Sequence, residues 1–198
     1  MEQAQAQPLE MLATPTEKRV NGANAHEAVE RTDDGSVLSL NDAAMVRAAM
    51  EGRSTTMRIL IEGGADVNVR LVDGWTPLMT AVWNAHLDTV NLLIKLKADV
   101  NIQTVNGWTA LMIAAWNGRA DFAQILLMAR AKYDLCDENG KTALMWAAQK
   151  GSLEVAQILV IHGANIESRN SQGMTAFDYA VRESHPDVAE YLASRRGK

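Results

Sequence analysis

The stretch GWTPLMTAVWN, residues 74–84, recurs with small changes further along the chain. The variants are GWTALMIAAWN at 107–117, GKTALMWAAQK at 140–150 and GMTAFDYAVRE at 173–183. Their opening glycines are 33 residues apart in each case. A fixed period of about 20 to 50 residues is typical of proteins built from stacked repeats. The period therefore predicts a repeat protein.

Within one copy, the local pattern predicts a turn followed by two helices. Glycine adopts positive φ at little cost, and the threonine two residues later is a favourable N-cap. In the copy at 74–84, Leu78, Ala81 and Val82 then recur at helical spacing and predict a core-facing stripe. A second helix follows a short loop. In two copies it ends near a glycine, Gly64 or Gly163, as a left-handed C-terminal cap requires.

This succession of turn, helix, loop, helix and extended return in 33 residues resembles the ankyrin repeat. The resemblance covers residues 41–196 and includes the Ala-Asp-Val-Asn return at 65–68 and 98–101. It implies an all-α solenoid of stacked helix-turn-helix units with short β-turn fingers. Two positions depart from the pattern, because Lys97 and Arg130 stand where glycine is expected to close the second helix. We expect those two helix ends to be strained.

The same alignment predicts the domain organisation. Residues 1–38 are rich in acidic residues and poor in large apolar ones, so we expect a disordered acidic tail, or a tail that folds onto a partner or onto the repeats. The ankyrin repeat domain is expected to span 39–198. Its predicted units are an N-cap repeat at 39–72, three full repeats at 73–105, 106–138 and 139–171, and a C-cap repeat at 172–198.

Composition excludes several classes of function. A net charge of −5 over 198 residues argues against a nucleic-acid-binding protein that neutralises phosphates. No apolar run approaches the length of a membrane span. The single cysteine, Cys136, cannot form an intrachain disulfide, and no secretory leader is evident. We therefore expect a reducing compartment, cytoplasmic or also nuclear.

No constellation of residues indicates catalysis or metal binding. The four histidines are not paired with one another or with Cys136 at metal-ligand spacing, and no glycine-rich phosphate loop occurs. His86 and His185 fall in the loop where the ankyrin pattern also carries histidine, which implies a structural role. We predict no enzyme activity, no metal and no cofactor. An enzyme that uses Cys136 is the alternative left open.

Tryptophan is concentrated at two aligned positions. Trp75 and Trp108 follow the turn glycine, and Trp83 and Trp116 end the first helix of the same copies. At 100° per residue, Trp83 lies about 140° from Leu78 and so points away from the core stripe. The ankyrin resemblance implies that fingers and first helices line a concave, partner-binding wall. The predicted partner-binding residues are Trp75, Trp83, Trp108, Trp116, Asp73, Asn84, Asn106, Asn117, Met50 and Gln149.

The predicted function is therefore that of a protein–protein interaction module. It would be a monomer on its own, and it would bind an apolar helix or extended segment of a partner protein through the concave surface. Two alternatives stay open. The indoles could instead seal the contacts between repeats, as we expect for Trp146, and the protein could be a structural subunit or assembly chaperone within a larger complex.

Overall fold

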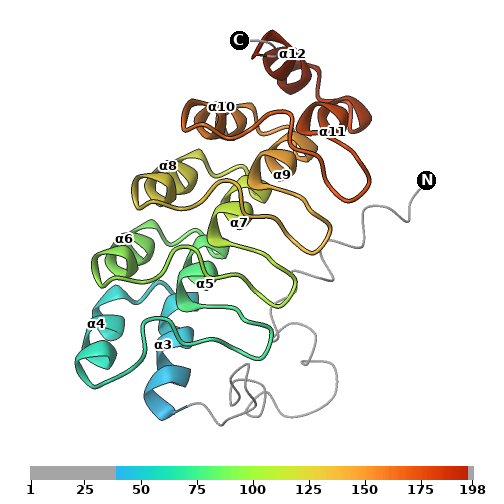
Figure 1. Ribbon diagram of the computed structural model, residues 1–198. Coiled ribbons are helices and arrows are strands. Elements are labelled where there is room, and N and C mark those ends of the chain that lie inside the picture. Colours follow the sequence, from blue (N-terminus) through green and yellow to red (C-terminus); the bar gives the residue numbers. More distant parts are fainter. Residues whose placement is uncertain (1–38, 196–198) are drawn as a thin grey trace.

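The computed structural model describes residues 39–195, which fold into five stacked pairs of helices (Figure 1). The first helix of each pair lies between the second helix and the long loops, and we call it the inner helix. The inner helices are α3 (Leu40–Met50), α5 (Pro77–Trp83), α7 (Ala110–Trp116), α9 (Ala143–Gln149) and α11 (Ala176–Arg182). The outer helices are α4 (Ser54–Glu62), α6 (Leu87–Lys95), α8 (Ala120–Met128), α10 (Leu153–Ile161) and α12 (Pro186–Arg195).

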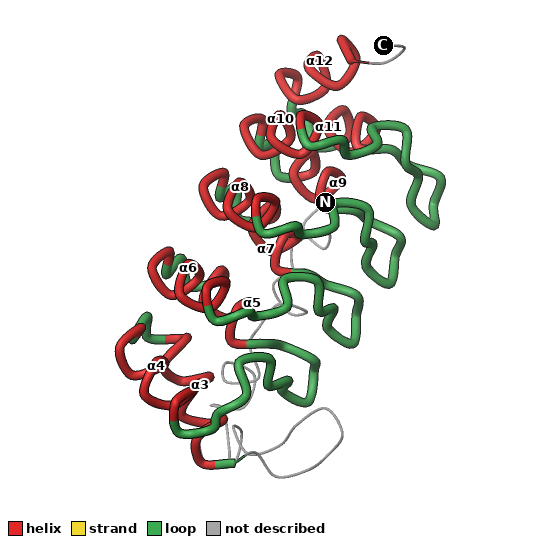
Figure 2. The backbone as a smooth tube through the Cα atoms, turned by 60° about the vertical axis from the view of Figure 1, so that its left-hand side comes forward, coloured by secondary structure: helices red, strands yellow, loops and turns green. Residues whose placement is uncertain are grey.

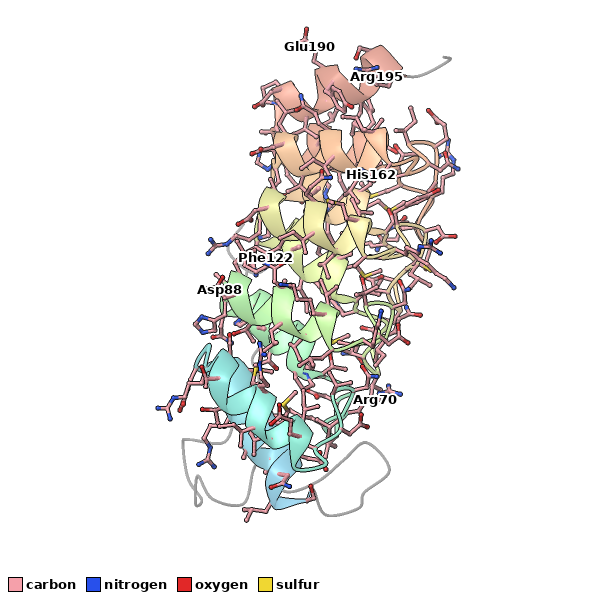
Figure 3. All side chains as sticks on the ribbon, turned by 90° about the vertical axis from the view of Figure 1, so that its left-hand side faces the viewer. Arg70, Asp88, Phe122, His162, Glu190 and Arg195 are labelled. Carbon is pink, nitrogen blue, oxygen red and sulfur yellow. The ribbon has the colours of Figure 1, made fainter. Side chains whose placement is uncertain are left out.

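The loops between pairs project to one side as a row of fingers (Figure 2). No strand occurs within residues 39–195, so the predicted all-α solenoid is confirmed. Seen from the outer helices, Arg70 lies on the finger side and Asp88 lies at the opposite edge (Figure 3). The tail predicted for residues 1–38 lies outside the described residues.

The local signals act as the sequence predicts. The turn glycines have positive φ, and a threonine caps each inner helix from α5 to α11. The Thr76 hydroxyl, for example, accepts a hydrogen bond from the backbone N–H of Met79 at 3.3 Å, and Pro77 occupies the first turn of α5. The first repeat differs, because Asn41 lies inside α3 and not in a turn; this helix is capped by Ser39.

The inner helices form a continuous column that carries most of the core. Every residue of α7 is buried, and α9 packs against both α7 and α11. Small residues at the centre of these helices, such as Ala114 and Ala147, allow the close approach of neighbouring helices. His86 and His185 link repeats through their Nε2 atoms, which lie 2.9 and 3.1 Å from the carbonyl oxygens of Met50 and Gln149.

Backbone hydrogen bonds join one finger to the next. The N–H groups of Val105, Glu138 and Ser171 donate to carbonyl oxygens of the preceding finger at 2.9 to 3.0 Å. This spacing leaves little room at the turn glycine. A Cβ atom on Gly107, whose φ is +79°, would lie 2.8 Å from the Cα of Asp137. The fingers therefore form one continuous surface along the stack.

Candidate functional site

In each of the last four repeats, two side chains meet where the finger joins the inner helix. The first follows the turn glycine, and the second is the last residue of the inner helix, eight positions later. Both repeats at 73–138 use two tryptophans, with ring centroids 6.2 Å apart for Trp75 and Trp83 and 6.1 Å apart for Trp108 and Trp116. The later repeats use polar pairs. Lys141 Nζ donates to Gln149 Oε1 at 2.8 Å, and Arg182 Nη1 lies 3.5 Å from the sulfur of Met174.

The tryptophans do not form the exposed patch that the sequence predicts. Trp75, Trp108 and Trp116 are only 5%, 3% and 8% exposed, and Trp83 is half-buried. The helical wheel was misleading because it places a residue relative to its own helix alone. The rings are covered instead by the finger and by the next repeat, so packing between repeats, the alternative that stayed open, describes these indoles better.

Differences in the following repeat explain why Trp83 is less buried than Trp116. Trp116 is covered by Trp146, at 5.0 Å between ring centroids, and by Lys150, whose Nζ lies 3.6 Å from the ring centroid. The residues aligned with these two, 33 positions earlier, are Ile113 and Asn117. Their smaller side chains leave one edge of Trp83 accessible.

The other predicted binding residues are all half-buried at this inner edge: Met50, Asp73, Asn84, Asn106, Asn117 and Gln149. Some of their polar groups are already engaged within the chain. Asn84 caps α5 and donates from Nδ2 to the Thr80 carbonyl at 2.8 Å. Asp73 accepts from the Trp75 N–H at 3.1 Å, and burial raises the pKa of its carboxyl.

A cluster of cations and aromatic rings occupies the inner face of the last two repeats. Lys141 Nζ lies 3.8 Å from the ring centroid of Trp146 and 4.6 Å from that of Tyr179. The guanidinium carbon of Arg182 lies 4.7 Å from the Tyr179 centroid. Cations over aromatic faces are attracted by the ring quadrupole. We define the cation–aromatic cluster as Lys141, Lys150, Arg182, Trp116, Trp146 and Tyr179.

Buried hydrogen bonds fix the two rings beside Lys141. The Trp146 indole N–H donates to Asp137 Oδ2 at 3.1 Å, and one repeat later the amide of Asn170 donates to the Tyr179 hydroxyl at 2.7 Å. Burial raises the pKa of Asp137, although the carboxylate also accepts two backbone N–H groups. Burial likewise lowers the pKa of Lys141 to about 8. The side chains of this cluster are thus held rigidly and engaged with each other.

The accessible apolar surface lies on the fingers, at residues that sequence reasoning missed. Val72 and Val105 are 58% and 70% exposed and occupy equivalent positions in adjacent fingers. They border a pocket of about 260 Å³ that we call the finger pocket. Its lining residues are Val72, Asp73, Trp75, Thr104, Val105, Asn106 and Trp108. The signal in the sequence was the replacement of these valines by Glu138 and Ser171 in the later repeats.

Other kinds of site find no support in the part of the chain that the structure describes. There, no group of three or more His, Cys, Asp or Glu side chains is placed to hold a metal ion. Cys136 is exposed. No helix within residues 39–195 has the length and apolar character needed to cross a membrane.

Comparison with known protein families agrees with the repeat geometry. A model of ankyrin repeats matches the sequence in three overlapping copies, at residues 21–104, 45–135 and 111–198. No curated protein matches the sequence. Ankyrin repeats are generally protein–protein interaction modules, and the family is typically non-enzymatic. On the matched span and on its architecture, this chain belongs to the ankyrin repeat family.

Proposed function

We propose that the protein binds a partner protein through the finger side of the stack, with the finger pocket as the anchor point. The partner inserts one large apolar side chain, from a helix or an extended segment, between the second and third fingers. The ends of the inner helices, including the exposed edge of Trp83, border the remainder of the contact. This proposal moves the centre of the predicted surface from the four indoles to the fingertips.

The exposed valine pair is the observation that carries the proposal. Val72 and Val105 stand side by side at the mouth of a pocket walled by Trp75 and Trp108. Single exposed apolar residues are ordinary, but apolar surface around a tryptophan-lined hollow is typical of interaction sites. The pocket is smaller than the roughly 300–1,000 Å³ of most small-molecule sites, which favours a protein side chain as its occupant.

An unsatisfied donor supports the same location. The indole N–H of Trp108 is buried and has no hydrogen-bond partner among the described residues, unlike that of Trp146. A buried donor without an acceptor costs about 1–3 kcal/mol. A backbone carbonyl of a bound segment is the kind of group that would relieve this cost.

The alternative function, a structural subunit held by its flat side, is favoured by a second apolar pair. Met128 and Ile161 end the outer helices α8 and α10 and are 72% and 76% exposed. They too are 33 residues apart, so they occupy equivalent positions on the opposite side of the stack. This pair is also a matched control for the valines.

The test compares two double variants, Val72→Asp with Val105→Asp and Met128→Asp with Ile161→Asp. Peptides are selected from a displayed random 16-residue library on the wild-type protein, and their Kd values are measured for each variant by fluorescence anisotropy. We expect the valine variant to bind at least tenfold more weakly and the outer-helix variant to bind normally. The reverse pattern would support the flat-side alternative, provided that circular dichroism shows both variants folded.

A further inference from the structure

The finger pocket and the cation–aromatic cluster are continuous with each other. Trp108 lines the pocket, and its ring centroid is 4.7 Å from that of Trp146 and 6.1 Å from that of Trp116. Lys141 lies over the Trp146 ring, and Lys150 lies over the Trp116 ring. Each ammonium group is therefore separated from the pocket wall by a single aromatic ring.

The cluster is rich in positive charge and poor in carboxylates that could neutralise it. The charged groups that act on Lys141 are Asp137, Arg182 and Glu183. Asp137 is buried, and its oxygens accept three N–H groups. Glu183 pairs with Arg182 at 2.8 Å. In the described part of the chain, three cations thus face one exposed carboxylate.

Lys150 is the cation most available to a partner. It is exposed and caps the C-terminus of α9, and Glu183 is the charge that acts on it. Its ammonium is held over Trp116, so its position is fixed before a partner arrives. A fixed cation loses less side-chain entropy on binding than a free surface lysine does. The rest of the chain is acidic, with a net charge of −5, so this positive region is a local departure.

From this charge complementarity we infer that the bound segment is acidic beside its apolar anchor. Resting on the proposed function, the inference assigns the large apolar side chain to the finger pocket. It assigns one or more aspartate or glutamate side chains to Lys150 and Arg182, toward the C-terminal end of the stack. Oppositely charged groups across an interface set register and select against wrong partners. A basic segment with the same apolar residue is therefore excluded.

The experiment uses the selected 16-residue peptides, the full chain and a charge-removing variant, Lys150→Met with Arg182→Met. Methionine keeps much of the apolar stem and removes the charge. The matched control is Lys95→Met with Arg119→Met, which removes two exposed cations at the outer helices α6 and α8. Peptides in which Asp and Glu are changed to Asn and Gln complete the set.

We expect selection to enrich acidic residues next to Leu, Ile, Phe or Trp. The Lys150→Met, Arg182→Met variant should raise the Kd about tenfold, as should the amide peptides, and the control variant should bind like wild type. The difference should shrink at about 0.5 M salt, where exposed charges are screened.

The outcomes separate the two proposals. Neutral or basic peptides that still depend on Val72 and Val105 would overturn the acidic partner and leave the finger pocket intact. Peptides that are unaffected by Val72→Asp with Val105→Asp would overturn the finger pocket itself. Failure to select any peptide above background would count against both.

Discussion

The second and third repeats differ from the fourth and fifth in how they close the same junction between finger and inner helix. In the earlier pair, Trp75 and Trp108 contact Trp83 and Trp116. In the later pair, Lys141 and Met174 occupy the first position, and Gln149 and Arg182 occupy the second. The backbone is the same in both halves, so side chains alone decide whether this junction is aromatic or cationic.

The boundary between the two halves is the most enclosed part of the inner surface. Trp146 belongs to the fourth repeat but packs on both tryptophans of the third, with centroid distances of 4.7 and 5.0 Å. Repeats in such stacks are stabilised by their neighbours as much as by their own contacts. The comparison therefore predicts that a substitution at the boundary costs more than a similar substitution inside the aromatic half.

The largest expected effect is that of Trp146→Ala. This ring is 4% exposed and contacts Trp108, Trp116 and Lys141, and its N–H is bonded to Asp137. Removing a buried large aromatic side chain costs about 3–5 kcal/mol of unfolding free energy. Urea denaturation followed by circular dichroism measures this loss.

Trp83→Ala is the matched control inside the aromatic half. Its ring contacts Trp75 alone among the aromatic groups of residues 39–195 and is half-buried, so we expect about half of that loss. Equal losses for the two variants would show that coverage by the following repeat does not determine stability at this junction.

Much of the fold was predictable because its signals are local. The threonine caps, the turn glycines and the apolar stripe of α5 each depend on residues within one turn of a helix. The positive φ of Lys97 and Arg130, both +67°, was predicted for the same reason. Each of these positions can be interpreted without knowing what packs on it.

The accessibility of the binding surface was not predictable in that way. Trp83 and Trp116 have the same place in their helices, and they differ because Ile113 and Trp146 differ in the following repeats. Burial of this kind depends on residues about thirty positions away. The exposed fingertips were missed for a different reason: Val105 resembles an ordinary core residue until its alignment with Glu138 places it on a fingertip.

A smaller effect is expected at the loop between the two helices of a pair. Gly151 has a φ of +69°, and a Cβ atom there would meet the ring of His185, which links two repeats. Gly151→Ala should cost about 2 kcal/mol through backbone strain and displacement of the ring. Thermal unfolding of the variant measures this cost.

Ala85 is the counterpart of Gly151 in the aromatic half, with a φ of +61°. The histidine's place in the next repeat is taken by Arg119, a longer and flexible side chain. Ala85→Gly should therefore be neutral or stabilise slightly. If Gly151→Ala left the Tm unchanged, the histidine contact would have no structural importance.

In the cationic half, the stability should depend on pH through Lys141. Burial lowers the pKa of this lysine from 10.5 to about 8, so the folded state binds fewer protons than the unfolded state between those values. The unfolding free energy contributed by Lys141 therefore rises as the pH increases from about 8 to 10.5. The half-exposed ammonium keeps part of its hydration, which limits the rise to about 1 kcal/mol.

Lys141→Met isolates this contribution from that of other groups that titrate at alkaline pH. We expect the variant to be the more stable protein at pH 7 and to lose that advantage by pH 10. Urea midpoints at several pH values measure the difference between the two proteins. A difference that stays constant with pH would mean that the ammonium is fully hydrated.

The smallest effect concerns strain that is confined to the aromatic half. Lys97 and Arg130 follow the outer helices of the second and third repeats in a left-handed conformation, whereas Gly64 and Gly163 occupy this position in the first and fourth. A non-glycine residue in this conformation costs about 1–2 kcal/mol, and the greater freedom of glycine in the unfolded chain offsets part of the relief. Lys97→Gly and Arg130→Gly should each stabilise the protein by about 0.5 kcal/mol, and Gly163→Ala should destabilise it. Because these sites lie on the outer side of the stack, the selected peptides should bind both stabilised variants with unchanged affinity. A weaker affinity would mean that strain in the outer loops helps to shape the finger pocket.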